Sequence, residues 1–161
     1  MSHAVEITTV VKDLDSLERA CSALGWKLIR DQKTYRWFGS WVDDSPVPEE
    51  MFTPQRLAEI RAMSREQRKA VMTEAMGRCD HAISVPGADY EVGVVKKSDG
   101  SYRLRWDYFD GKLLKAMGGQ HGGTLTQRYN MEVARREALK KGYRIAETRQ
   151  QDGTVKWLLA K

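Results

Sequence analysis

Cys79, Asp80 and His81 form a short run that brings a thiol close to an imidazole. A catalytic thiolate needs a nearby base, so the run suits a nucleophile in principle. A small buried cysteine at the start of a strand is the favoured interpretation. A structural zinc site normally needs two pairs of closely spaced ligands, and His3 and His121 lie far from this run. The sequence therefore predicts no catalytic residue, no metal site and no cofactor.

A glycine-rich loop, GGQHGG at Gly118–Gly123, precedes a predicted helix. No Gly-Lys-Ser/Thr follows it, so it is not a Walker loop. Backbone N–H groups at a helix N-terminus favour anions, which leaves phosphate binding open here. A plain flexible loop is the favoured interpretation.

Basic side chains give a stronger signal because they are unevenly distributed. The 161-residue chain has 27 Lys and Arg against 22 Asp and Glu, a net charge of +5. Residues 1–90 carry a net charge of −2, and residues 91–161 carry +7. An asymmetry of this kind points to a polyanionic partner for the second half.

Cations and aromatic rings together are what single-stranded nucleic acid binding needs, because phosphates take the charge and bases stack on rings. Three places supply them: a helix over about 124–141, a hairpin around Asp99-Gly100, and the run 35–42, whose rings have core packing as the alternative. If the hairpin turn has two residues, Lys96, Arg103 and Arg105 share a face. The predicted nucleic-acid contacts are Arg36, Trp37, Trp41, Lys96, Lys97, Arg103, Arg105, Arg128, Arg135, Arg136 and Lys140.

Elements of two kinds must position these residues. Alternating apolar residues predict strands over residues 4–12, 26–30, 35–42, 90–97 and 101–107, with a second hairpin formed by 143–148 and 154–161 around Asp152-Gly153. Helical spacing and capping residues predict helices over 14–24, 53–63, 64–76 and 124–141. The predicted fold is one α+β domain over 1–161, a mostly antiparallel sheet with helices on one face and a helical insertion at about 49–78.

Several motifs resemble one known family. The opening MSH with KDLDSLERACSALG, the Trp106-Asp107 strand end, LTQRYNMEVARREALKKGY and the turn at Gln151–Gly153 are similar to the chloroplast reading-frame thirty-five family. That family occurs in plastids, cyanobacteria and some bacteriophages, and the match covers both ends of the chain. The resemblance implies an α+β fold and a cytosolic or stromal setting. It implies no catalytic residues, because the family's function is unknown.

Two functions compete. The first is a non-catalytic accessory factor of replication or transcription that binds single-stranded nucleic acid, DNA rather than RNA. The second is an adaptor that docks a nucleotide-driven machine, an RNA polymerase or an ATPase, through the 43–77 region with its acidic connection 43–50. An enzyme is the least favoured class, because no carboxylate pair, triad or cofactor fingerprint is present.

The surroundings of the protein follow from composition. No apolar run is long enough for a membrane helix, and the N-terminus lacks the features of a secretory signal. Cys21 and Cys79 are far apart, which predicts free thiols in a reducing compartment. We therefore expect a cytoplasmic protein, in the host cytoplasm if a phage encodes it, and homo-oligomers stay an open expectation.

Overall fold

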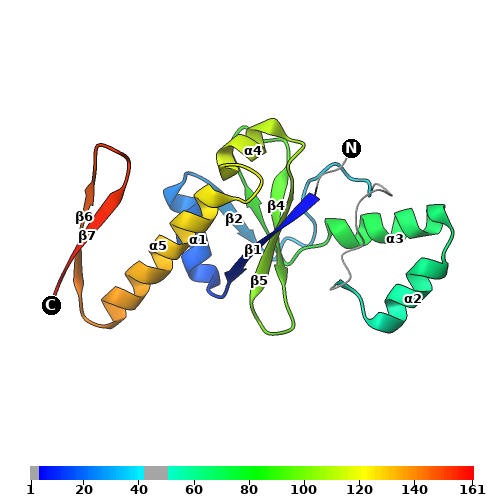
Figure 1. The fold of residues 1–161 in the computed structure, drawn as a ribbon, viewed down its shortest axis with the longest axis horizontal. Coiled ribbons are helices and arrows are strands. Elements are labelled where there is room, and N and C mark those ends of the chain that lie inside the picture. The colour runs from blue at the N-terminus through cyan, green and yellow to red at the C-terminus, as the bar shows by residue number, and fades with distance from the viewer. Residues whose placement is uncertain (1–3, 42–50) are drawn as a thin grey trace.

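The computed structural model describes residues 4–41 and 51–161, with side chains from Val10 onward in the first range. These residues form an α+β fold, as the sequence predicts (Figure 1). The helices are α1 (Leu14–Ala23), α2 (Pro54–Ala62), α3 (Arg65–Gly77), α4 (Gly111–Met117) and α5 (Gly123–Lys140). The strands are β1 (Ala4–Val11), β2 (Lys27–Arg30), β3 (His81–Ser84), β4 (Glu91–Lys96), β5 (Tyr102–Asp107), β6 (Arg144–Arg149) and β7 (Val155–Ala160).

Five strands form one antiparallel sheet in the order β1-β5-β4-β3-β2, and β6 pairs with β7 in a separate hairpin. The helix α4 is not predicted from the sequence, and β3 is predicted only as a strand that begins near Cys79, without bounds. Both are short, and a four-residue strand gives too few alternating positions to be recognised. The sheet's own register places β3 between β2 and β4.

The predicted strand over 35–42 is wrong for its described part, residues 35–41. This segment is anchored instead by its aromatic rings. The ring of Tyr35 lies over Gly93, where an added Cβ would be 2.6 Å from the ring, and Trp41 packs with Met72 and Met76 of α3. Its apolar residues are therefore core contacts. Residue 42 and the acidic connection 43–50 lie outside the described residues.

One face of the sheet carries the main core. There α1 and α5 pack against each other and against the sheet, and the fully buried side chains include Leu17, Leu104, Trp106 and Leu125. Asp13 caps the N-terminus of α1, and its side chain accepts a hydrogen bond from the Asp15 N–H. The predicted apolar stripe of α1 thus faces inward, since Leu17 is buried with Cys21 one turn later.

Both hairpins close with a three-residue turn. In the first, the N–H of Lys97 donates to the carbonyl of Ser101 at 2.7 Å, and the Asp99 carboxylate accepts from the N–H and Oγ of Ser101. Gly100 has a φ of +83°, which suits the left-handed last position of such a turn. Asp152, Gly153 and Thr154 repeat this arrangement in the second hairpin. The predicted hairpin tips are confirmed.

The turn length changes the register that the sequence analysis assumed. A two-residue turn would pair Lys96 with Arg103, whereas the observed ladder pairs Lys96 with Tyr102 and Arg103 with Val95. A shift by one residue moves every side chain to the opposite face. The expectation that Lys96 shares a face with Arg103 and Arg105 is therefore wrong in register.

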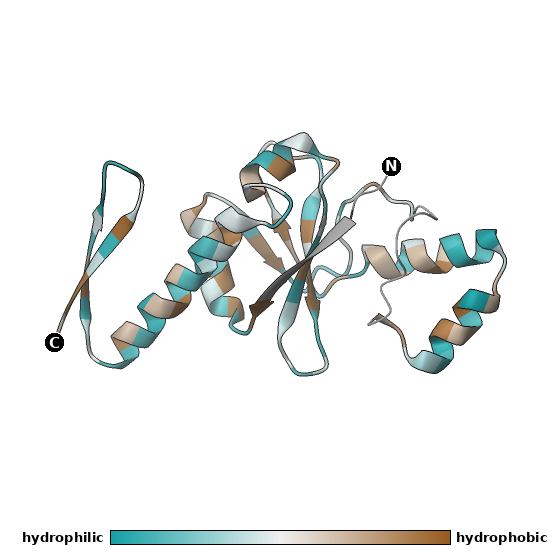
Figure 2. Cartoon of the chain, in the orientation of Figure 1, coloured by the Kyte–Doolittle hydropathy of each residue, from teal (hydrophilic) through white to brown (hydrophobic). Residues whose placement is uncertain are grey.

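The predicted helical pair is confirmed as α2 and α3. Thr53 caps α2, and Ser64 with Gln67 forms a capping box at the start of α3. In Figure 1 the pair projects from one side of the sheet, while α5 runs away on the other side and carries the β6–β7 hairpin. Figure 2 shows many hydrophilic residues on both projections. We call residues 123–161 the C-terminal arm; its net charge is +5.

Candidate nucleic-acid interface

A basic pocket lies at the tip of the β4–β5 hairpin. It has a volume of about 270 Å³ and is lined by Met51, Val95, Lys96, Lys97, Ser98, Arg103 and Arg105. Four of these side chains are cationic, and none of the described lining residues is acidic. Four of the basic residues predicted from the sequence therefore line one pocket, although the register turns the side chain of Lys96 to the face opposite Arg103 and Arg105.

Strand alternation explains how the pocket is built. Arg103 and Arg105 are two residues apart on β5, so they point to the same face of the sheet. Their partners across β4 are Val95 and Gly93, and the ring of Tyr35 fills the space over Gly93. Arg105 is only 2% exposed, and its Nη1 makes no hydrogen bond among the described residues. Glu6 stands opposite Arg105 in the β1–β5 ladder.

Lys97 lies at the rim of the pocket. Its Nζ is 3.7 Å from Oδ2 of Asp99, so this lysine forms an ion pair with an acidic residue of the turn. Hydrogen bonds from the side chain and backbone of Ser101 lower the pKa of Asp99, which stays ionised at neutral pH. A pair at this distance near the surface is weak, and a phosphate can compete for the lysine.

The cations of α5 are paired more thoroughly than the sequence indicates. Arg128 contacts Glu132 at 2.9 Å, and Lys140 contacts Glu137 at 3.2 Å. Two further partners come from elsewhere in the chain, because Arg136 pairs with Asp13 and Arg135 pairs with Glu147. Within the sequence of the helix only Glu132 and Glu137 are acidic. Tertiary structure therefore neutralises much of the expected basic face.

The predicted stacking residues are mostly core residues. Trp41 is 4% exposed, and Tyr35 is equally buried, so neither ring can stack on a base. Trp37 is half-buried and packs beside Gly77, where an added Cβ would lie 3.0 Å from its Nε1. Arg36 is exposed but lies 3.3 Å from the buried Glu91. In the segment 35–41, Tyr35 and Trp41 are therefore core residues.

A different aromatic pair is exposed. Phe38 and Phe109 meet edge to face with ring centroids 6.2 Å apart, and Phe109 is 57% exposed. Sequence reasoning missed this pair because the two residues are 71 positions apart and neither lies in a basic run. Phe38 is in the segment 35–41 and Phe109 follows β5. Exposed rings of this kind are suitable platforms for base stacking.

Cys79 and His81, which were considered as a nucleophile and its base, have structural hydrogen bonds instead. Cys79 Sγ donates to the Gln32 carbonyl at 3.0 Å, and burial raises the pKa of its thiol to about 12. Burial also lowers the pKa of His81, whose Nδ1 accepts from the Asp31 N–H at 3.0 Å. Outside residues 1–3 and 42–50, no group of three or more His, Cys, Asp or Glu is arranged to hold a metal ion. Both cysteines are free, as predicted.

The glycine-rich loop leads directly into α5. Gly122 precedes the first turn of α5, and no side chain caps the helix there. A Cβ at Gly118 would collide with the side chain of Thr124. Tight packing thus accounts for at least one glycine of this loop.

Comparison with protein-family models, with curated proteins and with solved structures found no match for this chain. The resemblance to the chloroplast reading-frame thirty-five family stays a prediction from the sequence. In the part of the chain that the structure describes, no helix has the length and apolarity to cross a bilayer.

Proposed function

We propose that this protein binds single-stranded nucleic acid, DNA in preference to RNA, through the basic pocket at the β4–β5 hairpin. The observation that carries the proposal is the pocket lined by Lys96, Lys97, Arg103 and Arg105 without an acidic lining residue among those described, with Arg103 and Arg105 on one face of the sheet and Lys97 at the rim. Phosphate oxygens accept charge-assisted hydrogen bonds from such cations.

Base stacking on Phe38 and Phe109 is the second part of the proposal. Glu91 and Asp107 lie at one end of the β4–β5 pair, and Lys97 at the other. Six residues of strand span about 20 Å. A short single strand that follows this pair can therefore place phosphates at the pocket and a base near Phe109.

The test measures binding of a labelled single-stranded DNA, a single-stranded RNA and a duplex of equal length by fluorescence anisotropy over a salt series. Counterion release predicts that affinity for a single strand falls with a slope of about −0.7 per neutralised phosphate in the log–log plot. Lys97→Ala and Arg103→Ala should each weaken binding to all sequences and reduce that slope by about 0.7.

Lys112→Ala is the matched control, because Lys112 is an exposed lysine outside the pocket. It should leave affinity and slope nearly unchanged. The proposal is wrong if the folded protein binds no single strand at low salt. It is also wrong if Lys112→Ala weakens binding as much as Lys97→Ala. The first result favours the alternative, a protein adaptor that uses the α2–α3 projection, whereas the second would place the nucleic-acid contacts outside the pocket.

A further inference from the structure

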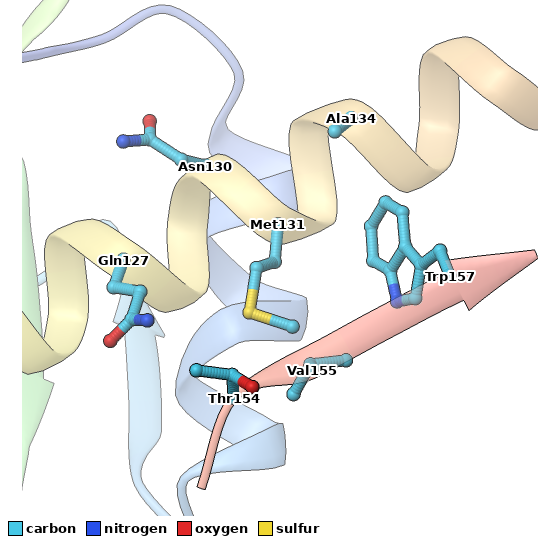
Figure 3. A pocket seen from close by; sticks show the side chains of 7 residues that line it. All are labelled: Gln127, Asn130, Met131, Ala134, Thr154, Val155 and Trp157. Atoms are coloured by element: carbon cyan, nitrogen blue, oxygen red, sulfur yellow. The ribbon is translucent and has the colours of Figure 1, made fainter. Parts of the chain in front are cut away.

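The β6–β7 hairpin has little support from the rest of the molecule. A two-stranded sheet is marginally stable by itself, and Figure 1 shows this one standing apart from the five-stranded sheet. An open groove of about 520 Å³ separates β7 from α5, with Met131, Ala134, Val155 and Trp157 among its lining residues (Figure 3). The hairpin therefore contacts α5 but does not pack tightly against it.

A few specific contacts hold the hairpin in place. The guanidinium of Arg135 lies 5.2 Å from the ring centroid of Trp157, and it pairs with Glu147. The Trp157 Nε1–H donates to the same carboxylate at 3.1 Å. These contacts fix one face of the hairpin only, since every residue that the ladder places on the other face is exposed.

The last three residues of β7 are apolar, and its outer edge is unpaired within the described sheets. Leu158 is 68% exposed, and Leu159 beside it is exposed as well. Edge strands are normally protected by charged side chains, as β2 is by Lys27 and Arg30 at its two ends. An exposed apolar edge of this kind pairs with another edge or aggregates.

We propose that β7 pairs with β7 of a second copy of this chain, in an antiparallel register with Leu158 opposite Leu158. The two hairpins then form one continuous four-stranded sheet. The N–H of Gln150 donates to the Thr154 carbonyl, so alternate residues from Thr154 to Leu158 turn their backbone groups toward β6. The backbone N–H and C=O groups of Trp157 and Leu159 consequently point to the free edge. There Trp157 would exchange hydrogen bonds with Leu159 of the second copy, and Leu159 with its Trp157.

Charge placement favours this register. Lys156 then faces Ala160 of the second copy, and the two lysines are about 14 Å apart, beyond the Debye length of about 8–10 Å. A register centred on Lys156 would place two lysines directly opposite each other, which is destabilising. The groove between β7 and α5, whose described lining residues are all uncharged, is not part of this edge.

The test is the oligomeric state of the full chain, measured by sedimentation equilibrium over a wide concentration range. The wild-type protein should form a concentration-dependent dimer. Leu158→Lys and Leu158→Glu should each shift the dissociation constant upward by at least tenfold, because each places like charges opposite one another at the centre. An equimolar mixture of the two variants should recover the dimer.

Ala146→Lys is the matched control. Ala146 pairs with Leu158 on the same exposed face, but it lies on β6, away from the proposed edge. Edge pairing predicts that Ala146→Lys still dimerises, whereas packing of sheet faces predicts that it does not. The inference is overturned if the wild-type protein is monomeric throughout, if Leu158→Lys dimerises normally, if the charged mixture stays monomeric, or if Ala146→Lys abolishes the dimer. Nucleic-acid binding is a separate readout and does not enter this test.

Discussion

Asp13 joins the two halves of the chain at the level of single residues. Its carboxylate caps α1 and pairs with Arg136 of α5. The Oη of Tyr129 accepts hydrogen bonds from the N–H groups of Lys12 and Asp13 at 3.0 and 3.2 Å. Burial opposes ionisation of Asp13, but hydrogen bonds from Ser16 and Arg136 outweigh it and lower the pKa of Asp13 to about 2.

The lowered pKa predicts an acid-dependent contribution to stability. Asn can still cap the helix, so Asp13→Asn removes mainly the charge. At neutral pH the variant should lose about 1 kcal/mol of unfolding free energy, a value discounted for solvent screening. Because the pKa is lower in the folded state than its ordinary value of 3.8, the difference from wild type should be complete above about pH 4 and disappear toward pH 2.

Urea unfolding at several pH values measures this difference. Arg136→Gln is the partner variant and should show the same loss between pH 4 and 7. A difference between Asp13→Asn and wild type that stays constant down to pH 2 would contradict the ion pair.

Phe109 provides a prediction that separates stacking from charge. If bases stack on it, Phe109→Ala should weaken single-strand binding by about 1–3 kcal/mol and leave the salt slope unchanged, since stacking releases no counterions. Leu139→Ala removes an equally exposed apolar side chain from α5 and is the control. Equal affinities of wild type and Phe109→Ala would exclude Phe109 as the platform.

Among the elements, the contact between the segment 35–41 and the sheet depends on a glycine at position 93 of β4. The Tyr35 ring occupies the space where a Cβ of Gly93 would lie. Gly93→Ala should therefore destabilise the fold by about 1–3 kcal/mol through overpacking. Gly111→Ala is the control, because nothing lies within 4 Å of a Cβ built there.

Thermal or urea unfolding of the two variants gives the comparison. Combining Gly93→Ala with Tyr35→Ala should cost less than the sum of the two single changes, because the ring that causes the clash is gone. If the two losses of unfolding free energy are additive, the Tyr35 ring does not clash with the alanine at position 93.

On the scale of the whole molecule, net charge overstates the charge that a ligand meets. The C-terminal arm accounts for a net charge of +5, but ion pairs tie much of α5 to Asp13, Glu132, Glu137 and Glu147. We expect Lys140→Gln combined with Glu137→Gln to leave single-strand affinity and its salt slope unchanged. Anisotropy measurements over the same salt series check this, and a slope reduced by about 0.7 would show that Lys140 contacts a phosphate.

Short-range patterns along the chain were enough to predict most of the helices and strands of this protein. Local signals were sufficient for α1, for the capped pair α2 and α3, and for both Asp-Gly hairpin tips, because caps and turns depend on residues only a few positions apart. The wide separation of Cys21 and Cys79 predicted free cysteines, and the order of the helices and strands predicted the α+β class.

Tertiary structure decided the candidate site. One residue in a turn moved Lys96 to the other face from Arg103, a difference that Asp99-Gly100 alone does not encode. Burial removed Tyr35 and Trp41 from the surface, Asp13 neutralised an arginine 123 positions away in the sequence, and Glu147 neutralised one in the preceding helix. Exposure and ion pairing depend on which distant segments meet, and a pattern read along the chain contains no distances between them.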